Sequence, residues 1–127
     1  MSDVVVTVPK QRWLDWMLEG LLPGEPWDGQ TESHFWLYPD RLPDMEPGDR
    51  VYIVAWGRVR GYAPLVRIER ACKLWKARAC LVRRADAVAV TIPTPIQGFR
   101  GWHYRAWDRE EEVPYPDWKW DGVDVAR

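Results

Sequence analysis

The chain has 127 residues, 46% of them hydrophobic and 29% charged, and a formal net charge of −1 at pH 7. This length suits one domain with a single core, and no apolar run of about 18 residues is present, so we expect no membrane span. Met1-Ser2-Asp3 lacks the basic and apolar regions of a signal peptide, and we expect a cytoplasmic protein. We expect residues 1–127 to form one domain, with residues 108–127 as an acidic, tryptophan-containing tail packed on it.

Charge is unevenly distributed along the chain. Residues 1–49 carry 3 basic and 10 acidic side chains, residues 50–109 carry 13 and 3, and residues 110–127 carry 2 and 6; these segments contribute −7, +10 and −4, which sum to −1. The basic middle segment favours an anionic partner. The alternative is that the acidic ends fold back and neutralise the middle segment.

Arginine and tryptophan are both abundant. Arginine outnumbers lysine by 14 to 4, and ten tryptophans are present. Arginine suits bidentate contacts with phosphate and stacking on rings. Ten tryptophans exceed what the core of a small domain usually holds, so we expect some of them in a groove or pocket.

Cys72 and Cys80 are the only cysteines. Two cysteines eight positions apart, without a second pair, match neither a zinc-binding pattern nor a disulfide framework, so we expect two small buried side chains. The sequence also lacks a Gly-rich phosphate loop and a spaced set of metal ligands, and we expect no cofactor and no metal.

The first part of the chain predicts strand, helix, strand. Residues 4–8 are typical of a short buried strand. Residues 10–19 carry apolar side chains at a period near 3.6, which predicts an amphipathic helix. Residues 33–38 predict a second strand, with Phe35 and Trp36 on opposite faces.

The stretch 47–62 predicts the hairpin around which the fold is organised. Residues 51–56 alternate with a period of two, and Trp56-Gly57-Arg58 is short enough to close a turn. Gly61 and Pro64 interrupt the returning strand, which predicts a bulge or an edge that bends the sheet toward a barrel.

Further strands follow. Residues 80–83 and 87–92 predict a second hairpin, and residues 98–107 predict a last aromatic and basic strand. We expect Trp118 and Trp120 to attach the irregular tail to the domain. The predicted fold class is α+β: a mixed or antiparallel barrel of about five to six strands with one N-terminal helix and short extra helices.

The order of these elements, with Pro47-Gly48-Asp49-Arg50-Val51-Tyr52 and Gly61-Tyr62-Ala63-Pro64-Leu65, resembles the PUA-like superfamily. The likeness covers about half of the chain and is greatest to the ASCH and EVE branches of small β-barrel domains. The resemblance implies a barrel with a cleft that binds RNA or DNA, sometimes with a modified base held in an aromatic cage. The Gly-x-Lys-x-x-Glu-x-Arg pattern of many ASCH domains is absent.

Nucleic-acid binding is the function that these features favour, with RNA ahead of DNA and with a modified or flipped base as a sharper version. The side chains expected to hold phosphates or stack on bases are Trp36, Trp56, Arg58, Arg60, Tyr62, Trp75, Arg100, Trp102 and Arg105. The side chains expected to read a base edge are Lys10, His34, Asp49 and His103. In the sharper version Trp36 and Trp56 form the pocket walls.

Two alternatives stay open. A small ASCH-type hydrolase acting on a nucleic acid or nucleoside would use His34, His103 or Lys10, although no catalytic motif is present. A protein–protein interaction module would use exposed aromatic rings. The acidic tail is also a candidate cover for the basic cleft.

Overall fold

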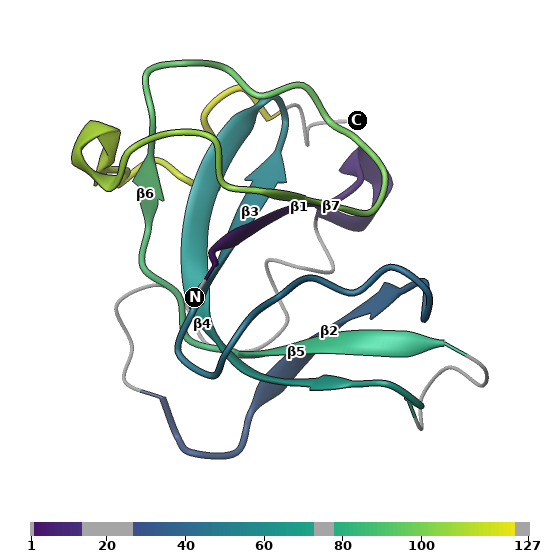
Figure 1. Cartoon of the computed structure of the whole chain (residues 1–127). Coiled ribbons are helices and arrows are strands. Elements are labelled where there is room, and N and C mark those ends of the chain that lie inside the picture. Colours follow the sequence, from purple (N-terminus) through teal and green to yellow (C-terminus); the bar gives the residue numbers. More distant parts are fainter. Residues whose placement is uncertain (1, 14–26, 73–77, 124–127) are drawn as a thin grey trace.

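A six-stranded sheet, curled into a half-barrel, forms the centre of the computed structural model, which describes residues 2–13, 27–72 and 78–123 (Figure 1). The strand order is β2-β5-β4-β3-β1-β7. The bounds of these strands are β1 Val4–Thr7, β2 Glu32–Leu37, β3 Arg50–Ala55, β4 Arg58–Glu69, β5 Ala79–Arg84 and β7 Trp102–Tyr104. A second sheet pairs β6 Val90–Thr91 with β8 Val113–Pro114.

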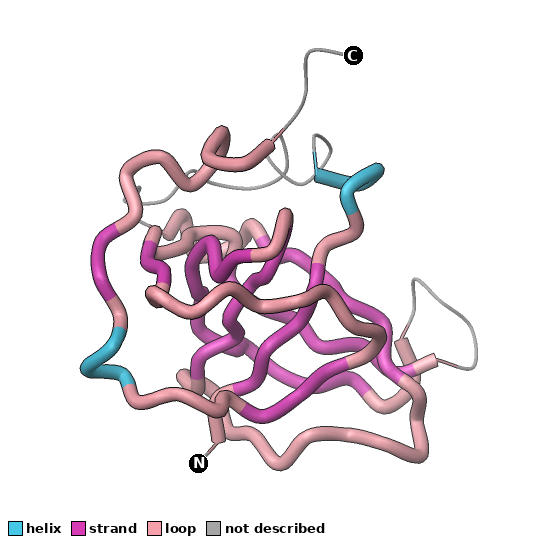
Figure 2. Tube along the Cα trace, turned by 90° about the horizontal axis from the view of Figure 1, so that it is seen from above, coloured by secondary structure: helices cyan, strands magenta, loops and turns pink. Residues whose placement is uncertain are grey.

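Strand β1 is the point at which the sheet changes direction. It runs parallel to β3, and the other pairs of the large sheet, including β1 with β7, are antiparallel. The two edges of the sheet are therefore β2 and β7. In Figure 1, β2 and β5 lie below β1 and β3, and Figure 2 shows the strands gathered into one curled layer with long loops along its border.

The predicted central hairpin is confirmed. Strands β3 and β4 are joined at Trp56 and Gly57, which both have positive φ, and the register shifts between Ile53 and Val54. A Cβ on Gly61 would lie 2.6 Å from the carbonyl oxygen of Val88. Only glycine allows this close approach, because any side chain would collide with the backbone there.

Two predictions of secondary structure are corrected. Residues 80–92 do not form a hairpin: β5 pairs with β2 and β4, and β6 pairs with β8 in the tail. The last strand is short, with only Trp102–Tyr104 of the predicted residues 98–107 in β7. Alternation is equally compatible with several partners, so a local pattern cannot choose between them.

The helical content differs from the prediction. The 3-10 turns η1 Lys10–Arg12 and η2 Arg109–Glu111 are the complete helical elements within the described residues, and the N-terminal helix is not shown. Residues 14–26, which include most of the predicted helix, lie outside the described part of the chain. None of the described helices is long and apolar enough to cross a membrane.

The curled sheet has apolar side chains on both faces. One face of β3 contributes Val51 and Ile53 to a cluster with Leu37, Leu81 and Trp102. Its other face contributes Tyr52 and Val54 to a cluster that includes Trp107. A strand buried on both sides has no polar alternation, which explains the continuous apolar run in β3.

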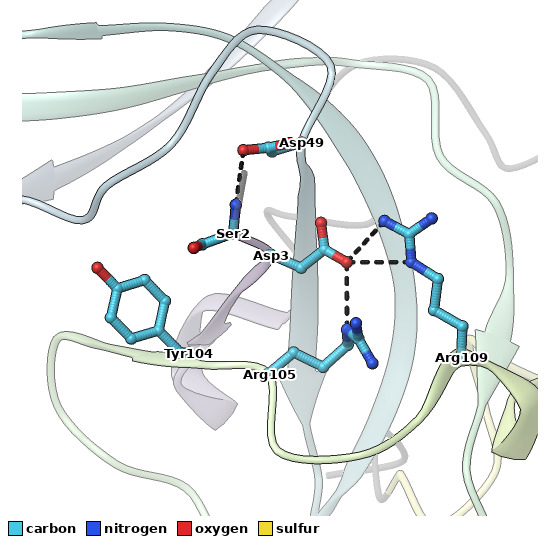
Figure 3. Close-up of a pocket in the computed structure, with 6 residues that line it drawn as sticks. All are labelled: Ser2, Asp3, Asp49, Tyr104, Arg105 and Arg109. Carbon is cyan, nitrogen blue, oxygen red and sulfur yellow. Dashed lines mark hydrogen bonds and ion pairs between the residues drawn. The ribbon is translucent and has the colours of Figure 1, made fainter.

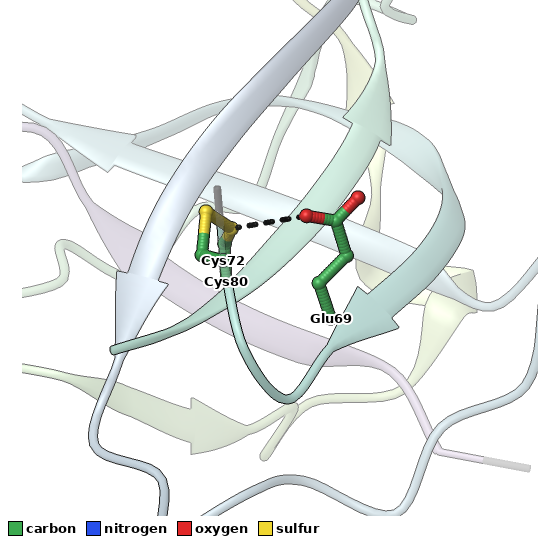
Figure 4. A group of neighbouring side chains, drawn as sticks. All are labelled: Glu69, Cys72 and Cys80. Carbon is green, nitrogen blue, oxygen red and sulfur yellow. Dashed lines mark hydrogen bonds between the residues drawn. A yellow bond between two sulfur atoms is a disulfide. The ribbon is translucent and has the colours of Figure 1, made fainter. Parts of the chain in front are cut away.

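Cys72 and Cys80 form a disulfide, which corrects the expectation of two separate side chains (Figure 4). The bond connects the residues after β4 to the second residue of β5, and Cys80 lies 3.7 Å from a carboxylate oxygen of Glu69. A disulfide is typical of proteins from oxidising compartments. The disulfide does not favour the predicted cytoplasmic location, which stays a prediction.

The tail packs on the β3–β4 hairpin. Tyr115 and Trp118 join a buried cluster with Trp13 and Ala55, whereas Trp120 is 57% exposed. The expected attachment by Trp118 is therefore present, and that by Trp120 is not. The end of η1 is also attached to the tail, because the indole nitrogen of Trp13 donates a hydrogen bond to the carbonyl of Lys119 at 3.1 Å.

Candidate ligand-binding cavity

A cavity of about 790 Å³ opens over the inner face of the curled sheet. Strand β2 borders it on one side, and the end of β1 with the segment before β7 borders it on the other. Its apolar floor comes from the first core cluster, including Val51, Ile53 and Leu81. A cavity of this size, with an apolar floor and a polar border, is typical of a site for a small molecule or a single base.

Strand pairing places polar groups on this floor. Ser33 on β2 lies opposite Arg83 on β5, so both side chains are on the face that carries Phe35 and Leu81. Ser33 is 5% exposed, and its hydroxyl has no hydrogen-bond partner within the described part of the chain. A buried hydroxyl without a partner costs stability and marks a place where a ligand can supply the missing bond.

Arginines surround the entrance of the cavity. Arg12, Arg41 and Arg100 line it and are exposed, and none has an ion-pair partner among the described residues. Within the described residues, no aspartate or glutamate lines the cavity. The cavity thus offers positive charge over an apolar, aromatic floor, which suits a planar anion.

Trp102 connects the aromatic floor to this charge. It is buried, and its indole nitrogen donates a hydrogen bond to the carbonyl of Arg41 at 3.1 Å. The guanidinium carbon of Arg41 lies 4.8 Å from the centre of the Trp102 ring. This pair of contacts fixes both the loop and the arginine at the entrance of the cavity.

A second pocket, of about 400 Å³, is lined by carboxylates as well as arginines, unlike the first (Figure 3). At its centre, the side chain of Asp3 is 4% exposed and accepts hydrogen bonds from Arg105, Arg109 and the backbone N–H of Arg50. Burial alone would raise the pKa of Asp3, but the Arg50 N–H and the guanidinium groups of Arg109 and Arg105 outweigh it and hold this pKa below its ordinary value. We call Asp3, Arg105 and Arg109 the Asp3 cluster.

Ion pairs join the acidic ends of the chain to its basic middle. These pairs are Arg50 with Glu112, Arg58 with Asp121, Arg67 with Glu32, and Arg105 and Arg109 with Asp3. Two further pairs, Arg67 with Glu69 and Arg84 with Asp86, lie within the middle segment. The acidic ends therefore neutralise part of the basic segment, as the second interpretation of the charge distribution proposed. The charge of the middle segment that is available to a ligand is therefore smaller than +10.

Four of the residues predicted from sequence line this cavity: His34, Trp36, Arg100 and Trp102. Trp56 does not, so Trp36 and Trp56 do not form two walls of one pocket. Trp56 lies in the β3–β4 turn, with the amino group of Lys10 4.8 Å from its ring centre.

Three of the predicted arginines have internal contacts. Arg60 is only 1% exposed and donates hydrogen bonds to the carbonyls of Ala55 and Trp118, so its assignment to phosphate is corrected. Arg58 is paired with Asp121, and Arg105 belongs to the Asp3 cluster.

The other predicted residues that the structure describes also lie outside the cavity. Asp49 is buried in a turn and accepts the backbone N–H groups of Ser2 and Glu46. Tyr62 packs against Tyr52, and its ring is covered by a guanidinium. His103 is exposed, with Phe99 at its edge. Trp75 lies outside the described residues.

Sequence reasoning missed Ser33, Arg12 and Arg41. A signal for Ser33 was present, because the alternation of residues 33–38 places this polar side chain on the same apolar face as Phe35. Arg12 and Arg41 carry no local signal, since they belong to the acidic first segment and reach the cavity only through the fold.

No family model, no curated protein and no solved structure matches this chain. Its function is therefore inferred from the cavity itself.

Proposed function

We propose that this protein binds single-stranded nucleic acid and that the large cavity receives one unpaired base. The observation that carries the proposal is the group of Arg12, Arg41 and Arg100 at a cavity with an aromatic floor and, among its described lining residues, no carboxylate. Arginines at the entrance neutralise phosphates, and a flat apolar floor stacks on a base. The resemblance to PUA-like domains, which include RNA-binding barrels, places RNA ahead of DNA.

The hydroxyl of Ser33 supports a base rather than an unspecific anion as the occupant. A buried hydroxyl can donate or accept one hydrogen bond at the edge of a base. A modified base is compatible with this arrangement, because selection would come from the shape of the pocket around that edge.

The test measures binding of fluorescent single-stranded RNA, single-stranded DNA and duplex at two salt concentrations. The double variant Arg41→Ala/Arg100→Ala should weaken single-strand binding at least tenfold, because it removes two of the cavity arginines. The matched control is Arg70→Ala, which removes an exposed arginine that does not line the cavity. No binding by the folded wild type at low salt would contradict the proposal.

A hydrolase is the second candidate, because His34 lines the same cavity. The other two residues considered for catalysis, His103 and Lys10, do not. Product formation from the bound RNA that is lost in His34→Ala would favour this alternative, whereas binding without turnover favours a binding module.

A further inference from the structure

We infer a second subsite, formed by Trp36, Tyr38 and Arg78, which binds the nucleotide next to the one in the cavity. We call these three residues the outer aromatic patch. The inference rests on the proposed function and makes it more specific: the ligand is a single strand of at least two nucleotides rather than a free mononucleotide.

The patch combines exposed rings with a cation. Trp36 is 42% exposed and Tyr38 is 55% exposed, and their rings meet edge to face at a centroid distance of 5.0 Å. The guanidinium carbon of Arg78 lies 5.0 Å from the Trp36 ring centre and 5.7 Å from that of Tyr38. Arg78 has no ion-pair partner among the described residues, so its charge is available to a phosphate.

The position of the patch follows from strand geometry. Trp36 alternates with Phe35, whose side chain belongs to the inner face of the sheet, so Trp36 starts from the opposite face of the same strand. Trp36 and Tyr38 both reach the border of the cavity, whereas Arg78 does not line it. Strand β2 is an edge of the sheet and borders the cavity. A single strand that crosses this edge can place one base in the cavity and stack the next on the patch.

The patch differs from an isolated exposed ring. Trp120 is also exposed, at 57%, but has no ring or cation contact among the described residues. Two rings and an unpaired guanidinium at a cavity border form the combination that stacks bases and holds the backbone of single strands. Trp120 therefore serves as the matched control for Trp36.

The experiment measures, by calorimetry, the binding of uridine 5′-monophosphate and of oligouridylates of two, three and six nucleotides. The wild type should bind the trinucleotide at least tenfold more tightly than the mononucleotide, as expected for one additional stacked base. Arg78→Ala should remove most of this gain and leave the affinity for the mononucleotide unchanged, because Arg78 does not line the cavity. Trp120→Ala should change neither value.

Trp36→Ala provides a second variant, which should also reduce the gain with length; because Trp36 borders the cavity as well, its effect on the mononucleotide does not decide between the two sites. Arg70→Ala, at an exposed arginine outside the cavity, should not reduce the gain. Equal affinity for mononucleotide and oligonucleotides would overturn the second subsite and leave the cavity proposal standing. A loss of mononucleotide affinity in Arg78→Ala would assign Arg78 to the cavity site and overturn the inference as well. If no nucleotide of any length binds, both proposals are wrong.

Discussion

The Asp3 cluster and the large cavity both contain arginines, but they use them in opposite ways. In the Asp3 cluster, two guanidinium groups and a backbone N–H converge on one buried carboxylate. At the cavity, Arg12, Arg41 and Arg100 have no such partner among the described residues. A basic stretch of sequence therefore divides into arginines that hold the fold together and arginines that remain available to a ligand.

This difference shows that pairing, rather than the number of arginines, identifies a candidate site. Arg60 and Arg105, like Arg100, have an aromatic residue within two positions in the sequence. The first two donate to internal carbonyls and carboxylates, whereas Arg100 lies at the entrance of the cavity. Five experiments can break or sharpen this comparison.

Asp3→Ala should lower the free energy of unfolding by about 3 kcal/mol, because it leaves the Arg50 N–H and two guanidinium groups without their acceptor. Urea denaturation measures the loss. Asp40→Asn, at an exposed carboxylate, is the control and should have little effect. Affinity for RNA in the folded variant should stay unchanged, and a selective loss of binding would show that the cluster is part of the site.

The same cluster predicts a dependence of stability on pH. The pKa of Asp3 is lower in the folded state than the ordinary value of an aspartate. Stability from this group is therefore fully present above about pH 4 and is lost as the pH falls toward the folded pKa, because the unfolded state then binds the extra proton. Acid titration of wild type and Asp3→Ala should give a shallower decline for the variant, and parallel curves would contradict this assignment.

Reduction of the Cys72–Cys80 disulfide should lower the free energy of unfolding by about 2 to 3 kcal/mol, because the bond closes a short loop in the unfolded chain. Thermal unfolding with and without reductant measures the shift. The double variant Cys72→Ala/Cys80→Ala should be insensitive to reductant. Neither cysteine lines the cavity, so a change in RNA affinity that exceeds the loss of folded protein would contradict a purely structural role.

Arg41→Ala/Arg100→Ala should reduce the dependence of RNA affinity on salt concentration. Two fewer phosphate contacts lower the slope of log affinity against log salt by about 1.4. The free energy of unfolding should fall by no more than about 1 kcal/mol, because the contact between Arg41 and the Trp102 ring is lost. Titrations at several salt concentrations measure the slope. Arg58→Ala is the contrasting variant, since its guanidinium is paired with Asp121 and its loss should affect the slope less.

Ser33→Ala should give the smallest effect: the free energy of unfolding should rise, and the affinity for RNA should fall. Removing a buried hydroxyl that has no partner within the described residues should raise the free energy of unfolding by up to about 1 kcal/mol. The variant should bind RNA several-fold more weakly, because the ligand loses one hydrogen bond. A loss of stability without a loss of affinity would show that Ser33 supports the fold instead.

Local patterns were enough to predict much of the framework. The strand predicted at residues 51–56 and the glycines at 57 and 61 correspond to β3, its turn and the register shift in β4. They succeed because neighbours in the chain decide turn geometry. Pairing between distant segments was predicted poorly: Val90 was assigned to a hairpin with β5, but its partner is Pro114 in the tail. Such pairing depends on where the chain returns, and no local pattern records it.

The sequence by itself determined the curled β-rich framework, because periodicity and turn residues act over a few positions. It also placed Trp36, Arg100 and Trp102 among the candidates. Only the tertiary structure decided that Arg60 is buried, that Arg105 is paired with Asp3, and that Ser33, Arg12 and Arg41 share a cavity with Arg100. The physical reason is that burial and ion pairing are made by contacts between segments as distant in sequence as Asp3 and Arg105, so a side chain's role is set by what the fold brings against it.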